Sequence, residues 1–202
     1  MTGTPEDDKH KRKMENRKAV QDAEVASKSI EKGLLIVNTG PGKGKTTAAM
    51  GLALRALGHG WHVGIVQWVK GTWVTGEKGA LEKFGDQVEF YALGNGFTWN
   101  TQDKTKDIAD CQAAWAIAKR MMADPKIKLL VLDELNIALR YDYLPLAEVV
   151  ATLAARRPEL HIVVTGRNAK PELLAIADTV TEMGAVKHHF AAGVKTQVGI
   201  EH

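Results

Sequence analysis

The chain has 202 residues, of which 45% are hydrophobic and 25% are charged, and these are ordinary values for a folded globular protein. They exclude collagen-like, mucin-like and wholly disordered classes, and a chain of this length can bury a substantial core. The formal net charge of +3 comes from 8 Lys/Arg against 7 Asp/Glu in residues 1–32 and from 19 against 17 in the remainder. No basic field of domain size results, so we expect no nucleic-acid partner.

The chain contains a single cysteine, Cys111. One cysteine excludes an internal disulfide framework and a cysteine-ligated zinc site, and it fits a reducing compartment. No apolar run reaches the roughly 18 residues that a membrane span needs, and the first residues lack the apolar segment of a secretory signal. We therefore expect a cytoplasmic protein with no membrane partner, in which Cys111 is a small buried residue of a helix.

Two regions follow one another along the chain. Residues 1–32 are polar, and we predict a tail to about His10 followed by a helix over 11–32 that needs a partner surface. Residues 33–202 form the second predicted domain, in which short apolar runs alternate with helical patterns. The runs predict strands at 34–37, 62–68, 88–92, 129–133, 161–165 and 179–183, and the patterns predict helices at 45–57, 104–122, 145–156 and 171–177.

This alternation predicts an α/β fold with a mostly parallel sheet that carries helices on both faces, plus the N-terminal helical extension. Two long loops, 69–79 and 93–103, interrupt the pattern. Long loops in a compact domain are more often functional than idle, so we expect both to contribute to a site.

The strongest motif follows the first predicted strand. Glycines that can turn backbone N–H groups toward phosphate oxygens precede a helix, whose N-terminus attracts anions. Lys45 would add a point charge, and the Thr46 hydroxyl can ligate Mg²⁺ or Mn²⁺. Thr39 replaces the first glycine of the usual pattern, and a ligand-free glycine turn is the alternative. The predicted nucleotide-binding residues are Gly40, Pro41, Gly42, Lys43, Gly44, Lys45, Thr46 and Thr47.

A second element is the apolar strand at 129–133, which ends in Asp133 and is followed by Glu134. A carboxylate at the C-terminal end of such a strand can hold or orient Mg²⁺ beside a phosphate loop, so we predict Thr46, Asp133 and Glu134 as metal ligands. The alternative is that both carboxylates cap the following helix. Arg167 follows the strand at 161–165, at the edge where α/β sheets bind ligands, and a phosphate or ribose contact is expected there.

Five segments in order resemble the P-loop type of ATP:corrinoid adenosyltransferases. They are the phosphate loop, the segment 66–77, the aromatic loop 94–103, the acidic strand end with 135–144, and the C-terminal third. Differences occur at Lys170 and at residues 194–196, away from the proposed chemistry. The resemblance implies a P-loop NTPase (RecA-like) fold and transfer of the 5′-deoxyadenosyl group of ATP to Co(I) of a corrinoid, either cobalamin or cobyrinic acid a,c-diamide, with triphosphate as the leaving group.

The same resemblance implies a homodimer, a transient flavoprotein or flavodoxin reductant, and an N-terminal helix that covers an active site of its own or of the partner chain. It implies that Phe97 and Trp99 exclude an axial ligand from the lower corrin face, although both could instead be core aromatics beneath a loop. Lys70 would contact nucleotide or corrin, or else be a solvated loop charge. The implied catalytic residues are Lys45, Phe97, Trp99 and Glu134.

Two other functions stay open from the residues alone: a RecA-like or other P-loop ATPase that acts on nucleic acid, and a small-molecule kinase. Trp68 ends a predicted strand and is more readily a core residue than a cavity wall. Adjacent His188 and His189 would face opposite ways on a strand and rarely chelate one metal, so we interpret both as structural.

Overall fold

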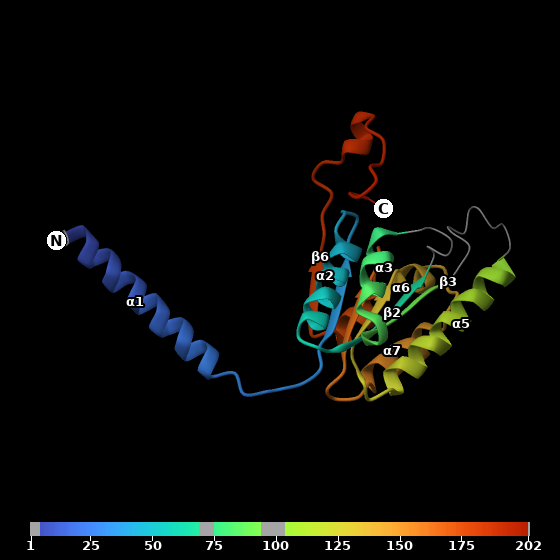
Figure 1. The fold of residues 1–202 in the computed structure, drawn as a ribbon, viewed down its shortest axis with the longest axis horizontal. Coiled ribbons are helices and arrows are strands. Elements are labelled where there is room, and N and C mark those ends of the chain that lie inside the picture. Colours follow the sequence, from blue (N-terminus) through green and yellow to red (C-terminus); the bar gives the residue numbers. More distant parts are fainter. Residues whose placement is uncertain (1–4, 69–74, 94–103, 202) are drawn as a thin grey trace. The chain divides into compact units, whose positions relative to one another are not determined.

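The computed structural model describes residues 5–68, 75–93 and 104–201. Its centre is a six-stranded sheet with the order β3-β2-β4-β5-β1-β6, in which every neighbouring pair is parallel (Figure 1). The strands are β1 (Leu35–Thr39), β2 (His62–Trp68), β3 (Val88–Leu93), β4 (Ile127–Asp133), β5 (His161–Thr165) and β6 (Thr179–Glu182). The predicted α/β class and all six predicted strands are confirmed.

The four helices predicted in the second domain are also present: α2 (Lys45–Gly58), α5 (Lys104–Ala123), α7 (Leu146–Ala154) and α8 (Pro171–Ile176). Four short elements were not predicted: α3 (Gly76–Leu81), the 3₁₀ turn η1 (Glu82–Gln87), α6 (Leu135–Arg140) and the 3₁₀ turn η2 (His189–Ala192). Each has six residues or fewer, which leaves little room for a helical period; α8 is equally short, but Pro171 marks its start. The segment 75–79, predicted as loop, therefore contains the start of a helix.

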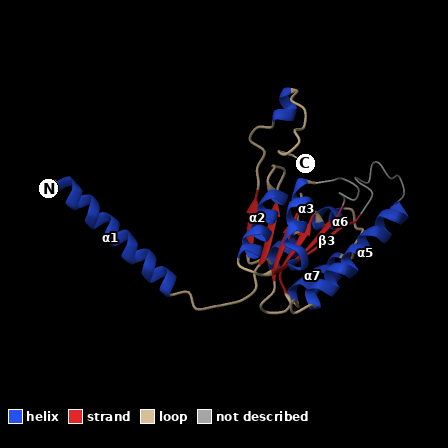
Figure 2. Cartoon of the chain, in the orientation of Figure 1, coloured by secondary structure: helices blue, strands red, loops and turns tan. Residues whose placement is uncertain are grey.

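Helices cover both faces of the sheet, as Figure 2 shows for the strands drawn in red between blue helices. Side chains of one strand alternate between two cores, so that Leu130 and Leu132 of β4 face one side and Leu129 and Val131 face the other. The first core packs against α5, α6, α7 and α8, and the second packs against α2 and α3. Burial on both faces explains why the strands read as continuous apolar runs.

The chain divides into two compact units, Met1–Lys32 and Gly33–His202. The first contains α1 (Pro5–Ala26), and every residue from 6 to 32 is exposed. The predicted helix over 11–32 was placed too late: it begins at Pro5 and ends at Ala26. Proline is favoured in the first helical turn, and the acidic residues Glu6, Asp7 and Asp8 there interact favourably with the helix dipole. The residues that favour the start of α1 therefore lie in the segment that the prediction assigned to a tail.

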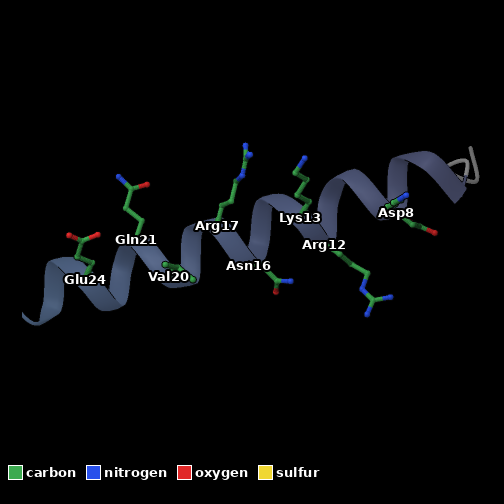
Figure 3. A pocket seen from close by; sticks show the side chains of 9 residues that line it. Asp8, Arg12, Lys13, Asn16, Arg17, Val20, Gln21 and Glu24 are labelled. Atoms are coloured by element: carbon green, nitrogen blue, oxygen red, sulfur yellow. The ribbon is translucent and has the colours of Figure 1, made fainter.

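Within the described ranges, no helix combines the length and the apolar character needed to cross a membrane. Figure 3 shows the side chains that line a groove along α1, and they point away from the helix on more than one side.

Candidate nucleotide and metal site

The phosphate loop connects β1 to α2 at the C-terminal end of β1. Gly40 and Gly44 have φ values of 97° and 105°, in the left-handed region that only glycine adopts without cost. Lys45 opens α2 and is only 6% exposed. Its Nζ donates hydrogen bonds to the carbonyl oxygens of Gly40 at 2.9 Å and of Gly42 at 2.6 Å. The ammonium group therefore lies inside the loop, where phosphate oxygens would be bound.

The phosphate loop contacts residues 183–184, which directly follow β6. The Gly42 N–H donates to the carbonyl of Met183 at 2.6 Å, and the Met183 N–H donates to the carbonyl of Thr39 at 2.9 Å. A Cβ at Gly42 would lie 2.4 Å from the carbonyl oxygen of Gly184. The loop is thus fixed against residues 183–184, and the Gly42 N–H serves this contact in the ligand-free chain.

Asp133, at the C-terminal end of β4, is held in place by hydrogen bonds from two neutral side chains. Asp133 is fully buried; its Oδ2 accepts a hydrogen bond from Gln67 Nε2 at 2.9 Å, and its Oδ1 accepts one from Thr165 Oγ1 at 2.7 Å. These three residues lie at the ends of the neighbouring strands β2, β4 and β5. The N-cap residue of α6 is Glu134 and not Asp133, whose carboxylate oxygens accept hydrogen bonds from the two neighbouring strands.

Glu134 has a backbone conformation that is unusual for a residue with a side chain. Its φ of 64° and ψ of 19° are left-handed, which costs about 1–2 kcal/mol in a residue other than glycine. It stands at the N-cap of α6 without a side-chain capping hydrogen bond, while its N–H donates to Thr165 Oγ1 at 2.9 Å. A Cβ at Gly166 would lie 3.1 Å from Glu134 Oε2, so this carboxylate lies against the backbone that follows β5.

Charges of the predicted site act on Lys45. Burial chiefly lowers the pKa of its ammonium group, and Arg167 and Lys43 lower it further, whereas Glu134 and Asp133 raise it. These four side chains are therefore within electrostatic range of Lys45. The structure brings together the lysine of the phosphate loop, the acidic end of β4 and the arginine after β5, as the sequence predicts for one edge of a parallel sheet.

Three of the predicted residues, Lys70, Phe97 and Trp99, fall outside the described residues. Trp68 is 1% exposed in the core, so its core interpretation is confirmed.

Cys111 is half-buried in α5 rather than fully buried. Burial, with Asp107 and Asp110, raises the pKa of its thiol to about 12. A neutral thiol is a poor nucleophile, so Cys111 has no evident chemical role.

Gln67, Asn136 and Thr165 lie at the same sheet edge as Asp133 but were not singled out from the sequence. Each is a buried polar residue near the C-terminal end of an apolar strand, which is the pattern that could have identified them. Asn136 Nδ2 donates to the carbonyl of Gly166 at 3.0 Å and thereby ties the start of α6 to the turn that carries Arg167. Their sequence positions alone do not show that these residues lie close together, because that depends on the order of the strands in the sheet.

The Thr165 hydroxyl gives a first testable prediction. It donates to Asp133 and accepts from the Glu134 N–H, so Thr165→Val leaves two buried polar groups without this partner. We expect Thr165→Val to lower the free energy of unfolding by about 2 kcal/mol, measured by urea denaturation. Thr165→Ser keeps the hydroxyl and should lose less than about 1 kcal/mol. Equal losses for both variants would contradict a role for the hydroxyl.

Comparisons with known proteins cover the whole chain. The family model described as ATP:corrinoid adenosyltransferase BtuR/CobO/CobP matches residues 31–202, and the model described as Cob(I)alamin adenosyltransferase N terminal matches residues 1–25. The chain is 50% identical over 202 residues to a corrinoid adenosyltransferase of Pseudomonas aeruginosa, covering 100% of both chains. It is 49% identical over 196 residues to the corrinoid adenosyltransferase CobA of Salmonella typhimurium, covering 97% of this chain and 99% of that protein. The chain belongs to the ATP:corrinoid adenosyltransferase family.

Proposed function

We propose that the chain transfers the 5′-deoxyadenosyl group of ATP to the cobalt of a reduced corrinoid and releases inorganic triphosphate, in the synthesis or salvage of adenosylcobalamin. The observation that carries this proposal is the phosphate loop with Lys45 enclosed in it, within a chain that is similar along its whole length to corrinoid adenosyltransferases. Family membership supplies the reaction class, and the geometry supplies the place for the triphosphate.

In this reaction the nucleophile arrives with the substrate. The electron pair of Co(I) would form a Co–C bond with C5′ of ATP, while the C5′–O bond breaks and its electron pair leaves with the triphosphate. The protein therefore needs no side-chain nucleophile, which agrees with the neutral thiol of Cys111. Its task is to hold C5′ in line with cobalt and to stabilise the charge that develops on the leaving triphosphate.

Several groups suit the second task. Lys45 would contribute its ammonium group, the backbone N–H groups of residues 43–47 their dipoles, and Arg167 its guanidinium group. In most P-loop enzymes the reaction takes place at the γ-phosphate. Here it takes place at C5′, so we propose that ATP binds in an orientation that presents its ribose, and not its terminal phosphate, to the second substrate.

A divalent cation fits the oxygen donors at this edge. Glu134 and the Thr46 hydroxyl are hard ligands of the kind that Mg²⁺ or Mn²⁺ prefers together with phosphate oxygens. Asp133 would be the third ligand, with its carboxylate held in place by hydrogen bonds from Gln67 and Thr165. When bound, the ion would neutralise charge on the triphosphate.

Further parts of the proposal concern the corrin-binding loops, the partners and the location of the protein. We propose that Phe97 and Trp99 face the lower side of the corrin ring, and that Lys70 contacts nucleotide or corrin. We propose a homodimer, which is supported by the exposed apolar side chains of the C-terminal segment, among them Phe190, Val198 and Ile200. The N-terminal helix would cover an active site, and a flavoprotein would supply the reducing electron. The low cysteine content supports a cytoplasmic location.

One product assay tests the function against a nucleic-acid ATPase and a kinase. The protein is incubated anaerobically in the dark with Mg-ATP and chemically reduced cobalamin, and separately with reduced cobyrinic acid a,c-diamide. We expect triphosphate in equal amount to a light-sensitive Co–C bond, and no phosphate release when the corrinoid is left out. ADP and orthophosphate without consumption of corrinoid would contradict the proposal, and the two corrinoids compared show which one is preferred.

A further inference from the structure

The segment after β6 contacts the phosphate loop at two points that are far apart in the sequence. The first is at residues 183–184, through the hydrogen bond between Gly42 and Met183. The second is at Glu201, whose Oε1 lies 2.8 Å from the Nζ of Lys43. Residues 185–200 thus lead away from the phosphate loop and return to it at Glu201. They are the red segment that extends past the end of the sheet in Figure 1.

The ion pair of Lys43 with Glu201 differs from an ordinary surface pair. The Glu201 side chain is only 8% exposed, whereas the Lys43 side chain is 62% exposed. The other carboxylate oxygen of Glu201 lies 3.4 Å from Nε2 of His189, and both of these atoms are buried without a hydrogen-bond partner of good geometry. Lys43 also lowers the pKa of the Glu201 carboxyl, so the ionised carboxylate is the favoured form. Glu201 is therefore an ionised carboxylate with little solvent exposure, and its main partner is Lys43 of the phosphate loop.

The local structure holds His189 in place. His189 begins η2 and stacks on His188 with ring centroids 4.8 Å apart, and Nδ1 of His188 accepts the N–H of Phe190. The Glu201 N–H donates to the carbonyl of Gln197 at 3.0 Å. The histidine pair thus shapes the place that Glu201 occupies, which gives a structural role to a pair that the nucleotide site does not use.

We infer that Glu201 is a positioning residue of the nucleotide site: it holds Lys43 and, through it, keeps residues 42–44 of the phosphate loop in the shape that binds the triphosphate. This inference deepens the proposed function and rests on it. The loop needs such support because its conformation depends on left-handed glycines at both ends, which are also free to adopt other conformations. Fixing both Gly42 and Lys43 reduces the entropy that the loop loses when the triphosphate binds.

The test measures ATP binding by calorimetry on the full chain, with no corrinoid present. We expect Glu201→Gln to raise the Kd for ATP about tenfold, as the loss of one charge-assisted hydrogen bond would. We expect Lys43→Met to raise the Kd by a similar factor, and the double variant to be no weaker than the weaker single variant, because both substitutions remove the same interaction. Glu148→Gln is the matched control: it breaks the pair of Glu148 with Lys119 at 3.0 Å, away from the loop, and should leave the Kd within twofold.

A second readout separates positioning from simple loss of structure. Hydrogen exchange in Glu201→Gln should speed up at the amides of residues 42–44 as well as in the segment 185–201, whereas a merely structural role would affect the segment alone. In the adenosylation assay the KM for ATP should rise while kcat changes less than twofold.

Additive effects of the two substitutions would overturn the inference. A Kd within twofold of the unsubstituted chain would also overturn it, as would tighter ATP binding by Glu201→Gln, which would show that Glu201 masks Lys43. Because ATP binding is measured without corrinoid, failure of the inference can be distinguished from failure of the proposed reaction.

Discussion

Replacement of Lys45 by methionine should reduce kcat/KM for adenosyl transfer by roughly 100-fold or more, because it removes a preorganised cation from the place where the triphosphate leaves. The ammonium group is enclosed by the loop carbonyls of Gly40 and Gly42, and no other lysine of the loop is comparably buried among the described residues. Methionine has nearly the length of lysine, so the variant removes charge with little change of shape. Steady-state kinetics with reduced corrinoid and varied Mg-ATP measures the effect.

The stability of the same variant separates loss of function from loss of fold. Burial is the largest cause of the lowered pKa of Lys45, so the folded ligand-free chain disfavours the charged form. Methionine removes that cost but also leaves two loop carbonyls without the lysine donor, and we expect the free energy of unfolding to change by less than about 1 kcal/mol. A catalytic loss together with a large loss of stability would show that Lys45 is a structural residue.

The lowered pKa of Lys45 also has a consequence for pH dependence. Since the folded-state pKa is below the unfolded one, the unfolded chain binds more protons in the interval between the two values, and stability therefore rises with pH there. The unsubstituted chain should gain stability relative to Lys45→Met as the pH is raised from 7 toward 10.5, the ordinary pKa of a lysine side chain. Urea denaturation of both chains at several pH values measures this difference, and an opposite trend would contradict the burial of the cation.

The sheet could be predicted from the sequence because strands that are buried on both faces consist of continuous apolar runs. β4 and β5 have apolar residues at nearly every position, and their ends are marked by the polar residues Asp133 and Thr165. The start of α1 was encoded in Pro5 and the acids that follow it, but a polar surface helix has no apolar stripe to define its limits. The six residues of α6 are too few to show a helical period, whereas the equally short α8 is marked by Pro171 at its start.

The site was predictable to the extent that it depends on local motifs. Lys45 and Asp133 belong to segments whose order along the chain identifies them, and the carboxyl edge of a parallel sheet brings them together. The partners of Asp133 depended on the strand order, which places β2 and β5 on either side of β4 and so brings Gln67 and Thr165 to it. Glu201 could not be predicted, because its pairing with Lys43 depends on the path of an irregular segment.

Gly42→Ala should disrupt the support of the phosphate loop through sterics alone. The backbone of Gly42 is not in the left-handed region, so alanine can adopt its φ without strain. The added Cβ would nevertheless lie 2.4 Å from the carbonyl oxygen of Gly184 and 2.7 Å from that of Met183, which are backbone atoms that cannot rotate away. Because the chain must shift to relieve these contacts, we expect a loss of about 1–3 kcal/mol in the free energy of unfolding and at least tenfold weaker ATP binding.

Gly51→Ala is the matched control for this substitution. Gly51 lies in the interior of α2, is exposed, and would place its Cβ in open space with no atom within 4 Å. Alanine favours the helix over glycine, so this variant should gain about 0.5–1 kcal/mol of stability while its ATP affinity stays unchanged. Urea denaturation and calorimetry on both variants provide the comparison. If Gly42→Ala bound ATP as tightly as Gly51→Ala, the contact with residues 183–184 would have no influence on ATP binding by the phosphate loop. That result would contradict the proposal that the C-terminal segment supports nucleotide binding through Gly42.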